Sequence, residues 1–241
     1  MQDIDSTNNL VLKKISASAE TITLNRDNSL YKAVIFDMDG VLLDSQHLHY
    51  QSDIAVLAKA GYQADMSTVI PYTGISNLER WPKYREDLGL EATTQTLIYW
   101  CNQMVTDIFN SAQLEPLPGI PELLNHISRK NLKIGLGSAS HPWLIKLVLS
   151  KLGIAHYFSA VVSCEEVGRG KPAPDVFLHA AKKLGEPAKY CVVIEDSQVG
   201  VQSAKNAGMT CIAYCNPSVH TQDVSLADYV VKNFKECLEW L

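Results

Sequence analysis

Six short segments rich in valine and isoleucine constrain the fold of this 241-residue chain more than any other feature. Their apolar residues follow one another without alternating polar positions, which is typical of strands covered on both faces. Helix-like segments lie between them, with proline near the start or glycine after the end. Strands that alternate with helices predict an α/β fold, a three-layer Rossmann-like core with a parallel sheet. The strand-like segments are 31–36, 132–137, 160–163, 190–194, 210–214 and 229–231, and the helix-like ones are 120–130, 142–153, 174–185 and 200–208.

One interval breaks the alternation of strands and helices. Between Asp44 and Pro118 the sequence shows helical stretches, such as 49–61 and 94–112, and no convincing buried strand. We therefore expect a small α-helical domain at 46–117, inserted into a core made of 31–45 and 118–241. Its aromatic residues Trp81, Tyr84, Tyr99 and Trp100 are expected to form its own core.

Residues 1–30 are polar and weakly patterned. We expect a flexible or loosely docked extension there, with an edge strand at 20–24 as the alternative.

Charge and composition exclude some classes of partner. The net charge of −5 and the pI near 5.8 argue against nucleic acid or an anionic membrane as the main partner, because both favour a basic face. No apolar run reaches the roughly 18 residues that a membrane span needs, and the first residues lack a signal pattern. We expect a cytoplasmic monomer without a membrane partner, whose six scattered cysteines are buried, reduced thiols.

Polar residues follow four of the strand-like segments. In open parallel sheets, ligands bind beyond the carboxyl ends of the strands, so these residues are candidates for a site. They are Asp37, Asp39 and Gly40 after the first segment, Ser138 and Ser140 at the second, Lys171 after the third, and Glu195 and Asp196 at the fourth.

The four carboxylates of this set indicate a metal ion. Carboxylates that share a pocket raise one another's pKa unless a cation neutralises them. Mg²⁺ fits best, because it binds through a few carboxylates together with water and phosphate oxygens. Ser138 and Lys171 are then left as donors for an anion that bridges to the metal, and a lysine suits a phosphoryl oxygen.

The spacing of Asp37 and Asp39 suits phosphoryl transfer. Residues i and i+2 that leave a strand point to the same side, so both carboxylates can face one small group. One can attack phosphorus while the other protonates the leaving oxygen and later activates water. Gly40 allows close backbone approach to a phosphate. Taken alone, an Asp before Gly is more often a helix cap or a turn residue, and it is the other strand ends that favour the catalytic interpretation.

Four stretches in this order resemble the motifs of the haloacid dehalogenase (HAD) superfamily, in the subgroup with a helical cap after the first motif. They are FDMDGVLLDS (36–45), GSAS (137–140), GKPAPD (170–175) and EDSQVGVQSAKNAG (195–208). The resemblance implies that the 46–117 insertion is a mobile lid that excludes water. It also implies Asp37 as nucleophile, Asp39 as general acid/base, Gly40, Ser138, Ala139 and Lys171 around the phosphate, and Asp37, the Asp39 backbone carbonyl, Glu195 and Asp196 around Mg²⁺.

Within that superfamily, the sequence is similar to β-phosphoglucomutase and to hexose-phosphate phosphatases. The mutase-like pattern would place an arginine after Ser76, where this chain has Asn77. Arg80, Lys83 or Arg85 could substitute for it. Further candidates for substrate contact are His49, Ser140 and His141.

The resemblance implies a Mg²⁺-dependent phosphatase for a small phosphorylated metabolite, a sugar phosphate, acting through an aspartyl-phosphate. A phosphosugar mutase is the close alternative, because it uses the same core. A phospho-aspartate signalling receiver is the distant one, since it also gathers carboxylates, a hydroxyl and a lysine at the ends of sheet strands.

Overall fold

The computed structural model describes residues 31–241, except 74 and 217–221. The extension predicted for residues 1–30, with its alternative edge strand, lies outside the described residues.

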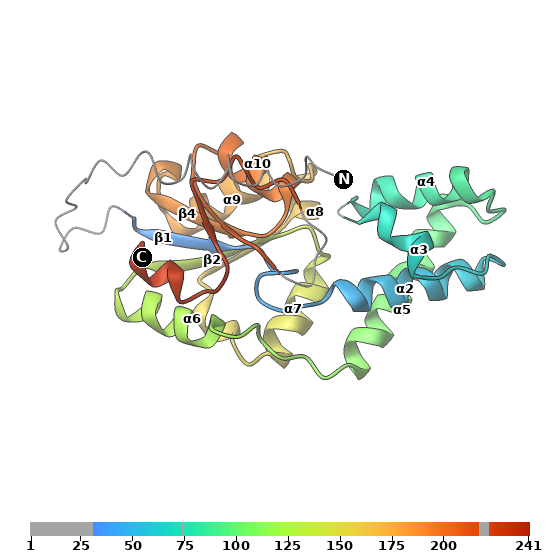
Figure 1. The fold of residues 1–241 in the computed structure, drawn as a ribbon, viewed down its shortest axis with the longest axis horizontal. Coiled ribbons are helices and arrows are strands. Elements are labelled where there is room, and N and C mark those ends of the chain that lie inside the picture. Colours follow the sequence, from blue (N-terminus) through green and yellow to red (C-terminus); the bar gives the residue numbers. More distant parts are fainter. Residues whose placement is uncertain (1–30, 74, 217–221) are drawn as a thin grey trace, which may run out of the picture. The chain divides into compact units, whose positions relative to one another are not determined.

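The core is a parallel sheet of six strands in the order β3-β2-β1-β4-β5-β6 (Figure 1). β1 is central and pairs with β2 on one side and β4 on the other. The chain runs outward from β1 to β3, then crosses to β4 and continues to β6, so its direction through the sheet reverses beside β1. The strands are β1 (Ala33–Phe36), β2 (Lys133–Ser138), β3 (Ala160–Ser163), β4 (Cys191–Glu195), β5 (Thr210–Tyr214) and β6 (Tyr229–Val231).

Helices cover both faces of this sheet, because alternate residues of each strand point to opposite sides. In β1, Val34 and Phe36 pack in the apolar cluster that includes residues of α6 and α7, whereas Ala33 and Ile35 pack with residues of α9 and α10. Figure 1 shows the two pairs of helices on opposite faces. The predicted three-layer α/β fold is confirmed. The core helices are α6 (Ile120–Arg129), α7 (Pro142–Lys151), α8 (Cys164–Val167), α9 (Asp175–Leu184) and α10 (Gln198–Asn206), with 3₁₀ turns η2 (Ala155–Tyr157), η3 (Ala188–Tyr190) and η4 (Glu236–Glu239).

The segment between β1 and α6 is helical throughout its described elements. It contains α2 (Gln46–Lys59), α3 (Met66–Val69), the 3₁₀ turn η1 (Ile70–Tyr72), α4 (Asn77–Leu88) and α5 (Thr94–Ser111). We call the residues 46–117 the cap. The chain leaves the core after β1 and returns beside its point of exit, where the Leu117 amide donates to the Leu42 carbonyl.

Two sequence predictions need correction in detail. Trp81 and Tyr84 are buried in the cap as expected, but Tyr99 is 60% exposed. The buried residues of α5 recur every fourth position at Leu97, Cys101, Val105 and Phe109, so Tyr99 lies off that stripe. Five of the six free cysteines are buried, whereas Cys215, just after β5, is exposed.

No helix in the described part of the chain is long and apolar enough to cross a bilayer.

Candidate active site

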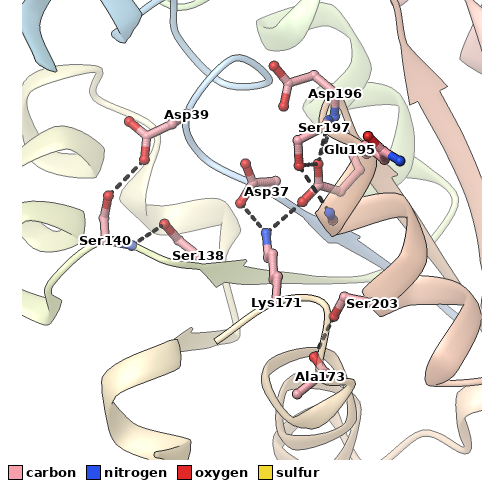
Figure 2. A network of polar contacts seen from close by, with 12 residues as sticks. Asp37, Asp39, Ser138, Ser140, Lys171, Ala173, Glu195, Asp196, Ser197 and Ser203 are labelled. Carbon is pink, nitrogen blue, oxygen red and sulfur yellow. Dashed lines mark hydrogen bonds and ion pairs between the residues drawn. The ribbon is translucent and has the colours of Figure 1, made fainter. Parts of the chain in front are cut away.

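The candidate residues meet at the carboxyl ends of β1, β2 and β4. Asp37 directly follows β1, Ser138 is the last residue of β2, and Glu195 is the last residue of β4. Figure 2 shows Lys171 reaching into the space between Asp37 and Glu195, with Asp39 and Ser140 to one side. The parallel sheet thus gathers residues that are more than a hundred positions apart in the sequence.

Lys171 joins two of the carboxylates. Its Nζ donates to Asp37 Oδ1 and to Glu195 Oε1, both at 2.6 Å, and its side chain is only 6% exposed. Burial alone would lower the pKa of Lys171, but the charges of Asp37 and Glu195 raise that pKa above its usual range. The lysine is therefore a fixed positive charge beside Asp37.

Glu195 is held in place by the start of α10. Its Oε2 accepts hydrogen bonds from the amides of Asp196 and Ser197 and from the Ser197 hydroxyl, at 2.8 to 3.0 Å. Gly200 packs against the same carboxylate, and a Cβ at that position would lie 1.7 Å from Glu195 Oε1. The fully buried side chain of Glu195 is therefore held in one position, and that position requires a glycine at residue 200.

A divalent cation fits beside these groups. Oxygen atoms of Asp37, Glu195 and Asp196 lie within 4.8 Å of one another. Together with Lys171 they carry a formal charge of −2 when all are ionised. Within the described residues, the Asp196 carboxylate has no hydrogen bond or ion pair, and burial raises its pKa, with Glu195 and Asp37 adding to the effect. Hard oxygen donors with uncompensated negative charge suit Mg²⁺.

Gly40 brings the backbone close to Asp196. Its φ is +83°, and a Cβ there would lie 2.0 Å from Asp196 Oδ2, so another residue would strain the backbone and displace the Asp196 carboxylate. The Gly40 carbonyl accepts a hydrogen bond from Nδ2 of the buried Asn216, at 3.1 Å. Asn216 follows β5 and was missed, although the rule that pointed to the earlier strand ends applies to it equally.

Asp37 carries a proton more readily than an ordinary aspartate. Burial raises its pKa to about 7, although Lys171 opposes the shift, and the charges of Glu195 and Asp39 add to it. Lys171 occupies Oδ1, and Oδ2 has no hydrogen bond within the described part of the chain. Positive charge beside Oδ2 would favour the ionised, nucleophilic form.

Asp39 points to a different set of partners. Its Oδ1 accepts from Ser45 Oγ at 2.5 Å and from His49 Nε2 at 3.1 Å, and its Oδ2 accepts from Ser140 Oγ at 2.7 Å. Burial would raise the pKa of Asp39, but these contacts lower it to about 2, with His49 the largest contributor. Asp39 is therefore ionised in this arrangement. Sequence reasoning missed Ser45, which looks like any polar residue before a helix.

The loop after β2 is held by two serine side chains, one at the end of β2 and one at the end of β3. The buried Ser138 Oγ accepts from the Ser140 amide at 3.0 Å, and Ser163 Oγ donates to the Ser140 carbonyl at 2.7 Å (Figure 2 shows the first contact). Ala139 between the two serines is exposed. The residue that caps the N-terminus of α7 is His141, whose Nδ1 accepts from the Trp143 amide at 3.3 Å. His141 Nε2 lies 3.4 Å from Glu165, and its substrate contact stays a prediction.

In the cap, Arg80 is bound to residues of the cap itself. Its Nε lies 3.2 Å from Asp53 Oδ2, and its Nη2 donates to Asp53 Oδ1 at 3.3 Å and to Asn77 Oδ1 at 2.5 Å. Asp53 is 3% exposed and also accepts from the Tyr84 hydroxyl at 3.2 Å. Asp53 was missed because an acidic residue in an amphipathic helix looks like a solvated position. No contact joins Asn77 or Arg80 to the carboxylate cluster among the described residues.

The sequence of this chain is similar to proteins of one known family. The family model "Haloacid dehalogenase-like hydrolase" matches residues 34–214. Fructose-1-phosphate phosphatase YqaB of Escherichia coli is 33% identical over 186 residues, which cover 76% of this chain and 95% of that protein. Beta-phosphoglucomutase of Bacillus subtilis is 34% identical over 186 residues, covering 74% of this chain and 80% of the relative.

One solved structure has the same fold as this chain. The crystal structure of CbbY from Rhodobacter sphaeroides in complex with phosphate superposes with a TM-score of 0.78, covering 86% of this chain and 96% of that one. At 20% identity this likeness concerns the fold alone. The family model spans most of the chain, from the second residue of β1 to the end of β5, and includes the strand ends that carry Asp37, Ser138 and Glu195. The chain therefore belongs to the haloacid dehalogenase-like hydrolases.

Proposed function

We propose that the protein is a Mg²⁺-dependent phosphatase that hydrolyses a small sugar phosphate through an aspartyl-phosphate on Asp37. The observation that carries the proposal is Asp37 itself, a buried carboxylate with one oxygen bound to Lys171 and the other without a hydrogen bond among the described residues. The acidic cluster beside it and the second carboxylate, Asp39, supply the remaining parts of a phosphoryl-transfer site. The names of the two relatives given above, a sugar-phosphate phosphatase and a sugar-phosphate mutase, support a sugar phosphate as the substrate.

The reaction has two steps on this chain. Asp37 Oδ2 attacks phosphorus, the bond from phosphorus to the sugar oxygen breaks, and Asp39 gives its proton to that oxygen. Asp39 then takes a proton from a water molecule, which attacks phosphorus, and inorganic phosphate leaves with Asp37 restored. Lys171 and the loop at Ser138 hold the phosphoryl oxygens.

Asp37, Glu195 and Asp196 would hold the metal. When bound, Mg²⁺ would neutralise the cluster and the developing charge on the phosphoryl oxygens. The predicted ligand from the Asp39 backbone carbonyl stays a prediction.

Asp39 has to change partners before it can act as an acid. A carboxylate with a pKa of about 2 has almost no proton to give near neutral pH. Release from His49 and Ser45 would let the pKa of Asp39 rise, since these two residues lower that pKa more than the remaining hydrogen bond from Ser140 does. We infer that substrate entry makes this exchange, and that the lid motion predicted for the cap accompanies it.

The charges of the cap favour hydrolysis over mutase activity. A mutase has to hold a second phosphate while the sugar turns over, and a cation is the natural partner for it. The cap contains four lysines and arginines, each with a partner inside the cap, and Arg80, the nearest in sequence to Asn77, neutralises a buried carboxylate. The partners are Trp100 beneath Lys59, Asp53 and Asn77 at Arg80, Asp87 beside Lys83, and the Ala92 carbonyl at Arg85.

The test is a panel of sugar phosphates incubated with the purified protein and Mg²⁺. We expect stoichiometric release of inorganic phosphate from a monophosphate such as fructose 1-phosphate or glucose 1-phosphate. Conversion of glucose 1-phosphate to glucose 6-phosphate without net release would instead establish the mutase alternative.

Two variants test the assigned roles. Asp37→Asn removes the nucleophile and should abolish turnover, while Asp39→Asn should leave a phosphoenzyme that clears about a hundredfold or more slowly, the usual contribution of a general base. Asp107→Asn, an exposed position on α5, is the control for loss of one negative charge. Full activity of Asp37→Asn would refute the mechanism, and a wild-type phosphoprotein stable for hours would favour the receiver-type alternative.

A further inference from the structure

We propose that Lys151 is a positioning residue that sets the general acid/base Asp39 by clamping the returning end of the cap to the core. The inference rests on the proposed role of Asp39. Lys151 is the last residue of α7 in the core, and its Nζ donates to three backbone carbonyls where α5 ends: Phe109 at 2.9 Å, Asn110 at 2.8 Å and Ala112 at 2.7 Å.

The end of α5 lacks the usual means of satisfying its last carbonyls. Helices often end in a left-handed glycine whose neighbours bond back to the final turn. Here the residue at the C-terminal end of the helix is Ala112, which has an extended conformation with φ −67° and ψ 141°. The Ser111 hydroxyl donates to the carbonyls of residues 107 and 108, and Lys151 supplies the donors for 109 and 110. An ammonium group also suits the negative end of the helix dipole.

This contact stands where the cap rejoins the core. After Ala112 the chain runs to Leu117, whose amide binds the Leu42 carbonyl next to the point of exit. Lys151 thus fixes the last turn of α5 to α7 at the second of the two connections between cap and core.

From that turn, a short series of contacts leads to Asp39. The fully buried Phe109 packs its ring 5.2 Å from the ring of His49 on α2, and His49 Nε2 binds Asp39 Oδ1. The other oxygen of Asp39 is held by Ser140, at the loop that leads into the first turn of α7 (Figure 2). The path from α7 through Lys151, α5, His49 and Asp39 therefore closes back on α7. Loosening Lys151 frees Phe109 and His49 to shift, and the side chain of Asp39 with them, so Asp39 is displaced from the leaving oxygen when substrate entry releases it from His49 and Ser45.

Two substrates with different leaving groups distinguish a positioning role of Lys151 from a merely structural one. A sugar oxygen has to be protonated as it departs, whereas nitrophenolate departs without a proton. The specificity constant kcat/KM reports the steps up to formation of the phosphoenzyme. A defect transmitted through Asp39 should therefore lower kcat/KM for a sugar phosphate more than for p-nitrophenyl phosphate.

The experiment compares Lys151→Met with Lys146→Met in the full-length protein. Lys146 lies on the same helix, is exposed, and has no hydrogen bond or ion pair in the part of the chain that the structure describes. We expect Lys151→Met to lower kcat/KM for the sugar phosphate about tenfold, a fraction of what general acid catalysis contributes, and to change p-nitrophenyl phosphate turnover less than about twofold. Lys151→Arg, which keeps the charge and the donors, should restore most of the loss.

Hydrogen exchange tests the clamp without any activity. In Lys151→Met, the amides of residues 109–117 should exchange faster than in wild type, while those of β1 and α9 stay unchanged. The hydrogen-exchange measurement tests the clamp even if the protein turns over no sugar phosphate. Failure of the proposed function and failure of the clamp are therefore distinguishable. Faster exchange with unchanged kinetics, or equal losses for the two substrates, would overturn the positioning role. If Lys151→Met folds poorly, Lys151→Gln serves in both arms.

Discussion

At the scale of single residues, the geometry of the site depends on two glycines as much as on its carboxylates. Gly200 leaves room for Glu195, and Gly40 leaves room for Asp196. In each case the missing side chain lets an acidic group occupy the place where it meets its partners. The positions of the Glu195 and Asp196 carboxylates therefore depend on the lack of a side chain at Gly200 and Gly40. A search of the sequence for acidic and basic residues alone does not reveal this dependence.

Gly200→Ala tests this dependence. In a helix, Gly to Ala usually stabilises by up to about 1 kcal/mol, so propensity alone predicts a harmless change. Because the new Cβ would lie 1.7 Å from Glu195 Oε1, we expect Mg²⁺ affinity to fall about 10- to 100-fold instead. Titration calorimetry measures the affinity.

Gly170→Ala is the matched control, because a Cβ there meets nothing within 4 Å. Equal Mg²⁺ affinity in the two variants would contradict the packing argument.

At the scale of elements, a buried ion pair joins two helices of the cap. Asp53 on α2 and Arg80 on α4 are almost completely removed from solvent, with side-chain exposures of 4% and 12%. Burial raises the pKa of Asp53, and Arg80 opposes that shift. Removing one member of such a pair leaves an uncompensated charge in the cap interior. Arg80 therefore has a structural task, which limits its use in binding substrate.

Asp53→Asn should destabilise the protein by about 3 kcal/mol, as expected when one partner of a buried pair is lost. Urea unfolding measures the free energy of unfolding. Lys83→Met is the control, since Lys83 and Asp87 are 55% and 42% exposed and 3.8 Å apart, and such pairs contribute about 1 kcal/mol or less. A loss for Asp53→Asn no larger than for Lys83→Met would show that the pair does not hold the cap together.

At the scale of the whole molecule, the sheet concentrates negative charge at one edge. The chain carries a net charge of −5, and the cluster at the ends of β1 and β4 contributes −2 of formal charge in a largely buried place. In the absence of a cation, protons compensate part of this charge, as the raised pKa of Asp37 and Asp196 indicates. Metal binding and proton binding are therefore coupled.

Mg²⁺ affinity should rise with pH. Burial raises the pKa of Asp37 to about 7, so below that pH the metal has to displace a proton. Each displaced proton weakens apparent affinity about tenfold per pH unit below the pKa, and the dependence should flatten above about pH 8. Calorimetry in buffers of different ionisation enthalpy measures both the affinity and the protons released. An affinity that stays constant between about pH 5.5 and 8, with no proton release, would contradict this coupling.

Much of the core and its candidate site could be predicted because both depend on short-range pattern. The apolar runs identified the strands, and the polar residues after Phe36, Gly137 and Ile194 lie at one sheet edge, as expected for parallel strands. The same rule would have found Asn216 had it been applied after β5. Asp53 could not be found in this way, because its partner Arg80 comes from another helix. Ser45 was missed because only the folded turn after β1 brings it to Asp39, six positions earlier. The spacing of the buried residues in α5 would have excluded Tyr99.

Sequence pattern was enough to predict the α/β core, a helical insertion, and acids, hydroxyls and a lysine at the strand ends. Hydrophobic period and chain order carry that information, and both are properties of neighbouring residues. The contacts of the folded chain were needed to show that Lys171 lies between Asp37 and Glu195, that Asp39 accepts hydrogen bonds from Ser45, His49 and Ser140, and that Arg80 pairs with Asp53. The direction of a long side chain is set by the nearest opposite charge in space, and that charge comes from another element of the fold.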